Sequence, residues 1–253
     1  MNEKLKMVIF HPVLTGFLMT MMVWYLGYVL MDTRSIPAPW QAIIYLVEAS
    51  DVMVIHLGAS FLRVAVALGI ALMIGVPIGI LTGVSSRFNR WFSPFLYYIY
   101  PIPKVAFLPV LMLLYGLGNQ SKIILMVLII VFQIILSVRD GVRQIAATQF
   151  TVMASFKASK LATLRFLIIP AILPQLFSGI RVSIGVSLAT LFFAENYATT
   201  YGIGYFILSA WTKMNYVEMF SGILALSFLG ILMFKTLDVT ERKLTPWQTP
   251  ATS

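Results

Sequence analysis

Long apolar stretches separated by short polar segments dominate the sequence. The stretches cover residues 11–31, 56–83, 92–115, 122–143 and 170–195, and a last one closes near residue 237. A run of about 18 or more apolar residues is long enough to cross a bilayer as a helix. The pattern therefore predicts an all-α fold, a polytopic transmembrane helical bundle with about six spans.

Glycine and proline interrupt two of these spans. The stretch 92–115 contains Pro94, Pro101, Pro103 and Pro109. Because proline removes a backbone donor and clashes with the preceding turn, a straight helix is not expected there. The second span is predicted to be broken around Pro77, where neighbouring helices or a cavity must satisfy the freed backbone groups. Glycines of the second and fifth spans are expected to permit close helix packing, namely Gly69, Gly75, Gly79, Gly179 and Gly185.

The connections between the spans are short. Residues 32–55 form a polar outer connection that contains an amphipathic piece, and residues 85–90 read as a short basic loop. A turn is expected over 116–121, and a second outer connection over 196–216. From Asp238 onward the chain is polar, so residues 238–253 are predicted to be a frayed cytoplasmic tail.

Composition removes other classes of protein. The chain is 60% hydrophobic and only 11% charged, which is far from the balance of a soluble domain. The net charge of +9 comes from basic residues scattered at the ends of apolar spans, so nucleic acid is not expected as a partner. The sequence contains no cysteine and no GxxxxGK[ST] motif. Any ATP-binding site therefore belongs to another chain.

Charge also predicts the orientation. Basic residues concentrate on one side of the predicted spans, namely Lys4, Lys6, Arg87, Arg90, Arg139, Arg143, Lys157, Lys160, Arg165, Arg242 and Lys243. The other side holds only Arg34, Lys122 and Lys213. Cytoplasmic loops carry the excess of Lys and Arg, so both termini are predicted to be cytoplasmic. No cleavage site follows the first span, which is read as uncleaved.

The largest polar interruption covers residues 144–168 and is predicted to be cytoplasmic. Its apolar residues are spaced to give two short helices an apolar side, namely Phe150, Met153, Phe156, Leu161 and Leu164. Ser159 is a plausible N-cap for the second helix. The simpler interpretation of residues 144–168 is an ordinary solvated loop. The alternative is that the segment docks a partner.

Several stretches resemble a known family. PIPKVAFLPVLMLLYGLGNQSKI at 101–123 and LPQLFSGIRVSIGVSLATLFFAE at 173–195 are similar to permeases of nitrate, sulfonate, taurine, bicarbonate and thiamine-precursor ABC importers. SFLRVAVALGIALMIGVPIGILTG at 60–83 and YGIGYFI at 201–207 extend the resemblance. The segment 144–168, which is followed by Pro170, resembles the EAA loop of these permeases. Thr151 and Lys157 stand where the loop pattern has an acidic residue and a glycine.

The resemblance implies the architecture and the partners. It implies a type I ABC importer permease fold over residues 56–237, in the bacterial cytoplasmic membrane. ATP-binding ABC subunits, a periplasmic or lipid-anchored solute-binding protein, a second permease copy and membrane lipid are the implied partners. The implied ATPase contacts on the coupling loop are Thr151, Met153, Ala154, Ser155, Phe156, Lys157, Ala158, Ser159, Lys160 and Pro170.

Four charged residues stand inside or beside the predicted spans: Arg63, Lys104, Arg181 and Glu195. Charge is costly there and by default indicates function, so each is a candidate for the translocation path. The alternatives are an internal ion pair, with Glu195 as an obvious partner, or snorkelling to the membrane surface. Arg181 is predicted near mid-bilayer, about 16 Å along a helix from Pro170.

Function is predicted as a permease subunit, not an enzyme, that forms the path for a small anionic solute. Neither a metal site nor a cofactor is expected on this chain. The rival readings are a secondary transporter, for which Glu195 is a weak coupling candidate, an intramembrane enzyme, and a membrane assembly protein without transport. The solute stays open, as does the choice between a permease homodimer and a heterodimer.

Overall fold

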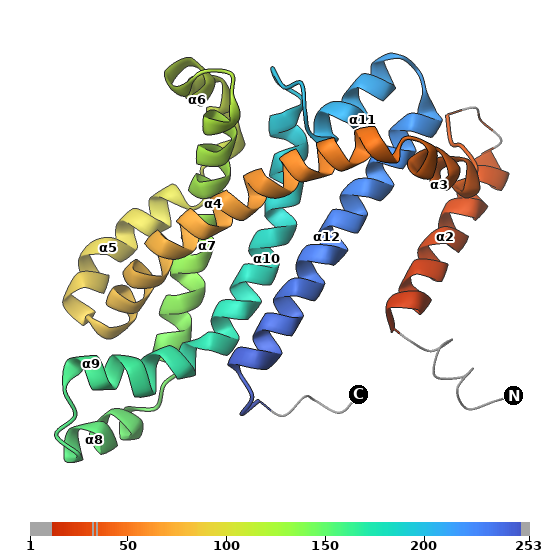
Figure 1. Ribbon diagram of the computed structural model, residues 1–253. Helices are drawn as coiled ribbons and strands as arrows, with labels where there is room; N and C mark the ends of the chain where they lie inside the picture. Colours follow the sequence, from red (N-terminus) through yellow and green to blue (C-terminus); the bar gives the residue numbers. More distant parts are fainter. Residues whose placement is uncertain (1–11, 32, 34, 249–253) are drawn as a thin grey trace, which may run out of the picture.

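The computed structural model describes residues 12–31, 33 and 35–248, and every regular element within them is a helix (Figure 1). Lys4, Lys6, His11 and Arg34, which entered the sequence predictions, lie outside the described residues. The helices are α2 (Pro12–Met31), α3 (Pro39–Glu48), α4 (Ser50–Val84), α5 (Ser86–Ile99), η1 (Lys104–Phe107), α6 (Leu108–Tyr115), α7 (Asn119–Arg143), α8 (Ala147–Ser155), α9 (Lys160–Thr163), η2 (Leu164–Ile168), α10 (Ile169–Glu195), α11 (Ile203–Thr212) and α12 (Tyr216–Leu244).

The described helices match the predicted spans in number. Five of them are long and apolar enough to cross a membrane, and a bent pair over residues 86–115 makes a sixth if it counts as one span. The two halves of that pair meet at an angle of 78°. The prolines had predicted that this span would not be straight, and this is confirmed. The bundle is all-α, as expected.

The core lies where α4, α7 and α10 pack together. A stripe of glycines one helical turn apart, Gly75, Gly79 and Gly83, faces α7. A Cβ at Gly79 would lie 2.7 Å from Cβ of Val138, so only glycine permits the observed approach. Gly179 lies equally close to Ser137 on α7. The packing role predicted for glycines is therefore confirmed at Gly75, Gly79 and Gly179.

The same expectation is wrong within this chain at Gly69 and Gly185. A Cβ added at either glycine would meet no described atom of a neighbouring helix within 4 Å. The predicted break of the second span is also wrong, because α4 continues through Pro77 without interruption. α7 packs closely against this stretch of α4. A neighbouring helix of this kind lets a transmembrane helix tolerate a proline.

Two predicted boundaries need correction. Residues 86–90 are not a loop: α5 begins at Ser86, and the hydroxyl of Ser85 accepts a hydrogen bond from the backbone N–H of Phe88 at 3.2 Å. The predicted tail is helical at its start, since α12 continues past Leu237 to Leu244. Within this added stretch, Asp238 and Glu241 form ion pairs with Arg181 on α10.

The polar segment forms two short helices at one end of the bundle, α8 and α9, drawn in green at the lower left of Figure 1. The predicted helix, turn and second helix are present. The second helix does not stop before Pro170, however. α9, η2 and α10 form one apolar helical stretch from Lys160 to Glu195, with a π-helical turn at Leu164–Ile168.

Candidate functional site

The two short helices expose part of their apolar side. Phe150 and Leu164 pack against the main core, whereas Phe156 is 79% exposed and Leu161 is 73% exposed. Phe166, just beyond α9, is 68% exposed. Two of the five predicted apolar positions thus hold the loop on the bundle, Met153 is half-buried, and two are left without cover by described residues. We call the surface around Phe156, Lys160 and Leu161 the loop surface.

The turn between α8 and α9 has a defined geometry. The N–H of Lys157 donates to the carbonyl of Ala154 at 2.9 Å, and that of Ala158 donates to Met153 at 3.0 Å. This pair of bonds is a Schellman ending, whose first residue past the C-cap adopts the left-handed conformation and is usually glycine. Lys157 occupies that position with φ of 50°. The turn does need a positive φ, and here lysine supplies it.

The remaining loop residues stabilise the two helices. Ser159 is the predicted N-cap of α9, and its hydroxyl accepts a hydrogen bond from the N–H of Ala162 at 3.1 Å. Thr151 and Ser155 direct their hydroxyls to carbonyls of their own helix. Ala154 and Lys160 are exposed, and neither Lys157 nor Lys160 is in an ion pair with a described residue.

A buried charge cluster lies at the opposite end of α10. Nη1 of Arg63 on α4 donates to the carboxylate of Glu195, the last residue of α10, and both side chains are buried. The hydroxyl of Ser60 donates to the same carboxylate at 2.9 and 3.0 Å. The expectation that Arg63 pairs internally with Glu195 is therefore what the geometry shows.

Glu195 also positions the helix that follows it. Its Oε2 accepts a hydrogen bond of 2.8 Å from the N–H of Gly204, in the first turn of α11. A carboxylate at a helix N-terminus satisfies free backbone donors and interacts favourably with the helix dipole. Gly202 has φ of 149° and its Cα faces the Glu195 carboxylate, leaving no room for a Cβ. The YGIG sequence is thus the place where the backbone wraps around this carboxylate.

Two polar residues complete this end of the bundle. Nδ1 of His56 lies 3.0 Å from both the N–H and the carbonyl of Gly202, which fixes the same backbone. Lys122 on α7 is 1% exposed, and its ammonium donates to the carbonyls of Leu117, Gly118 and Ala198 at 2.9 to 3.4 Å. The sequence pattern had started the fourth span at Lys122, whereas α7 begins one turn earlier, at Asn119, and Lys122 is buried.

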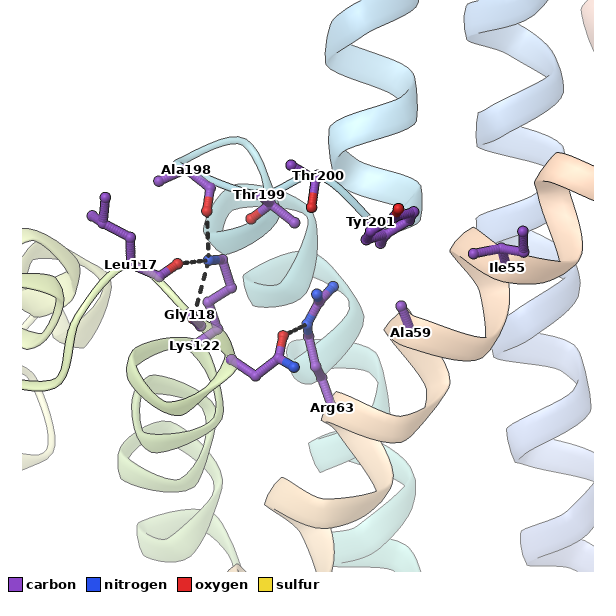
Figure 2. Close-up of a pocket in the computed structure, with 11 residues that line it drawn as sticks. Ile55, Ala59, Arg63, Leu117, Gly118, Lys122, Ala198, Thr199, Thr200 and Tyr201 are labelled. Atoms are coloured by element: carbon purple, nitrogen blue, oxygen red, sulfur yellow. Dashed lines mark hydrogen bonds between the residues drawn. The ribbon is translucent and has the colours of Figure 1, made fainter.

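A pocket of about 380 Å³ opens beside the cluster (Figure 2). Ala59 and Arg63 line it from α4, and Asn119 and Lys122 line it from the start of α7. The loop 198–201 between α10 and α11 lines the remaining side. In Figure 2 the guanidinium of Arg63 points toward this loop, below Thr200 and Tyr201.

The other two charged candidates are separate from this pocket. Arg181 donates to Asp238 at 2.6 Å and to Glu241 at 2.9 Å, and its side chain is 42% exposed. Both partners lie in the last two turns of α12, so Arg181 is in an internal ion pair, and its position near mid-bilayer stays a prediction. Lys104 donates to the carbonyls of Ile99 and Tyr100, where the chain bends after α5.

Comparison with known proteins decides what this bundle is. The family of binding-protein-dependent transport system inner membrane components matches residues 75–247, which is more than half of the chain. The chain belongs to this permease family. The predicted family is thereby confirmed, and the matched region includes α7, the helical loop and Glu195.

Relatives and solved structures agree with this assignment. The permease is 33% identical over 192 residues to the taurine transport system permease protein TauC of Escherichia coli K12, covering 76% of this chain and 70% of TauC. It is 26% identical over 234 residues to the formylaminopyrimidine transport permease protein ThiX of Halalkalibacterium halodurans, covering 92% and 94% of the two chains. An inward-facing structure of the MetNI methionine ABC transporter matches with a TM-score of 0.67 at 17% identity, covering 78% of this chain and 98% of that one. This last likeness shows the fold.

These findings place the permease among the membrane-spanning subunits of ABC importers, which are transport subunits and not enzymes. Sequence reasoning had selected Arg63 and Glu195 but had missed Ser60 and the role of Lys122. The available signal for Lys122 was its position just after the turn 116–121, within reach of the carbonyls of Leu117 and Gly118.

Proposed function

We propose that this permease forms the translocation path for a small oxyanion and is driven by separate ATPase subunits that bind the loop surface. Two permease copies would face each other across the path, and an outer solute-binding protein would deliver the solute. ATP binding on the partner chains would move the helical loops. Because α9 is continuous with α10, that movement would reach the bundle as a shift of a whole helix.

The exposed apolar side of the loop carries the proposal. Phe156 and Leu161 protrude from a segment that is otherwise well held by Phe150, Leu164 and the Ser159 cap. A rigid element with an uncovered aromatic anchor and adjacent lysines is suited to a groove with acidic residues at its rim. Since α10 spans 27 residues, or about 40 Å, the loop can act on the far end of the bundle.

Relatives support the class of solute. Close matches are named for taurine, aliphatic sulfonates, bicarbonate and nitrate, all of which carry an oxyanion group. We therefore propose a sulfonate, nitrate, bicarbonate or related compound. The basic residues Arg63 and Lys122 lining a pocket are consistent with such a solute.

The test is co-purification of an ATPase with the tagged full-length chain from gently solubilised membranes, with the partner identified by its P-loop peptide. The variant combines Phe156→Ala with Lys160→Glu. The matched control is Leu113→Ala, which removes an equally exposed apolar side chain on α6, 86% exposed. We expect at least a tenfold loss of bound ATPase in the variant and no loss in the control.

Both failures have a clear meaning. If the variant retains its ATPase, the contact lies elsewhere on the chain. If no P-loop protein co-purifies with the wild type, even after cross-linking through a cysteine placed at Ser155, the coupled importer is wrong and a membrane protein without transport becomes the better reading.

A further inference from the structure

The pocket at the outer end of α10 has the features of a ligand site and not only of a packing defect. Its walls come from three separate parts of the chain, α4, the start of α7 and the loop 198–201. We propose that this pocket is a binding site for a small oxyanion, bound by Nη2 of Arg63 and by the hydroxyls of Thr200 and Tyr201 and attracted by the positive charge of Lys122, whose three donors are already bonded to carbonyls. The inference deepens the proposed function, since that oxyanion would be the imported solute.

Charge is the first argument. Arg63 and Lys122 are 6% and 1% exposed, and among the described residues Glu195 is the only buried carboxylate. Glu195 is shared between Arg63, Ser60 and the N–H of Gly204, while the described carboxylates leave Lys122 without an ion pair. One positive charge is therefore left over. Burying an uncompensated charge is costly, and an anion in the pocket would remove that cost.

Free donors are the second argument. The guanidinium of Arg63 donates from Nε to the side-chain oxygen Oδ1 of Asn119, at 2.8 Å, and from Nη1 to the carboxylate of Glu195. Its Nη2 donates to none of the described residues and is not enclosed by the protein. Figure 2 shows this end of the side chain directed to the space bounded by Thr199, Thr200 and Tyr201. Arginine suits oxyanions because its donors are planar and fixed in direction.

The third argument is that the ammonium of Lys122 and the guanidinium of Arg63 are held in place before any ligand arrives. Three carbonyls fix the ammonium, and two side chains fix the guanidinium. A preformed pair of cations loses little side-chain entropy on binding. The same carbonyls weaken the field of Lys122, so the site is expected to release its anion readily, as a transport site must.

Two sources could supply the oxyanion: a soluble solute or the phosphate of a lipid headgroup. We commit to the solute, because polar residues line the pocket from α4, from the start of α7 and from the loop 198–201, and its volume of about 380 Å³ leaves ample room for a small oxyanion with its water. The experiment nevertheless treats the lipid separately.

The test measures the melting temperature of the purified full-length chain in an uncharged detergent. The probes are sodium nitrate and sodium methanesulfonate, compared with sodium chloride at the same ionic strength. At about ten times the Kd we expect the melting temperature to rise by about 3 °C. A separate arm adds phosphatidylglycerol, with phosphatidylcholine as its control.

Two variants locate the effect. Ala59→Leu fills the pocket without touching the charges, and Ala65→Leu places the same side chain on the same helix outside the pocket. Arg63→Lys keeps a cation for Glu195 but removes the fork, and Arg181→Lys is its control on the exposed ion pair. We expect Ala59→Leu and Arg63→Lys to raise the Kd for the anion at least tenfold. The two controls should leave this Kd unchanged. If Arg63→Lys does not fold, Ala59→Leu decides.

The outcomes separate this inference from the proposed function. Equal stabilisation of the wild type and Ala59→Leu, or no stabilisation by either free anion, overturns the site. Stabilisation by phosphatidylglycerol alone also overturns it, in favour of a headgroup. None of these results depends on an ATPase. Loss of the anion site with retained ATPase binding would leave the coupled permease standing.

Discussion

The two ends of the bundle treat their side chains in opposite ways. At the pocket end, charged and polar residues are buried and bonded to one another, with Glu195 alone satisfying donors from Arg63, Ser60 and Gly204. At the loop end, large apolar residues are exposed, with Phe156 79% accessible. At the pocket end the polar groups are satisfied within the chain. At the loop end the exposed apolar residues are of the kind that a partner protein covers.

This difference indicates where each end finds its stability. The buried cluster depends on contacts within the chain, so removing one member leaves its partners unsatisfied. The loop surface contributes little to folding, so its residues can be changed with small effects on the isolated chain. Mutations should therefore damage folding at one end and partner binding at the other.

The largest effect is expected for Glu195→Ala. The variant leaves Arg63 buried without a counter-charge and the N–H of Gly204 without an acceptor, at a cost of about 3–5 kcal/mol in the free energy of unfolding. The control is Asp238→Ala, whose partner Arg181 is partly exposed and whose loss should cost about 1 kcal/mol or less. The yield of monodisperse protein and its melting temperature measure both. Equal melting of the two variants would mean that the buried pair is not a fold determinant.

A smaller effect is expected for Gly204→Ala. The new Cβ would lie 2.7 Å from the carbonyl oxygen of Phe192 and 2.8 Å from Cβ of Glu195, so α11 must shift. The expected loss is about 1–3 kcal/mol. Gly185→Ala on α10 is the control. The alanine Cβ would meet no described atom of a neighbouring element within 4 Å, so this variant should be neutral or slightly stabilising. Thermal unfolding compares them, and a neutral Gly204→Ala would show that the YGIG wrap tolerates displacement.

The smallest effect is expected at the loop end of the bundle, in the turn between α8 and α9. Lys157→Gly should stabilise the turn between α8 and α9 by about 1 kcal/mol, because glycine adopts a positive φ without steric cost. Lys160→Gly, three residues later at the first position of α9, should bring no stabilisation and should cost less than the roughly 1 kcal/mol of a glycine in a helix interior. Hydrogen exchange of the loop amides measures the local change, which a global melt would miss. Faster exchange in Lys157→Gly would contradict the strain argument.

Much of the fold could be predicted because hydrophobic length is a strong signal. The all-α bundle, the number of spans, the non-straight third span and the helix–turn–helix of the loop all follow from local pattern. Local pattern failed where packing overrides it. Pro77 does not break α4, because Gly75, Gly79 and Gly83 let α7 lie against that stretch. Asp238 does not begin a frayed tail: α12 continues to Leu244, and Asp238 is in an ion pair with Arg181 of another helix.

The candidate site was predicted in parts. Arg63 and Glu195 were selected because a charge inside an apolar span is conspicuous, and their pairing was weighed as one option. Lys122 was predicted only as the first residue of an apolar run, and its burial was not predicted. Its burial depends on carbonyls of Leu117, Gly118 and Ala198, and the last of these is 76 residues away.

By itself, the sequence determined that this chain crosses a membrane repeatedly, that residues 144–168 interrupt the apolar pattern, and that the chain resembles importer permeases. These properties depend on composition and on spacing within single helices. Only the tertiary structure decided which charges face one another, which glycines are needed and which apolar residues stay uncovered. The reason is physical: whether a charge is paired or a phenyl ring is buried depends on neighbours distant in sequence, and those are set when the helices pack.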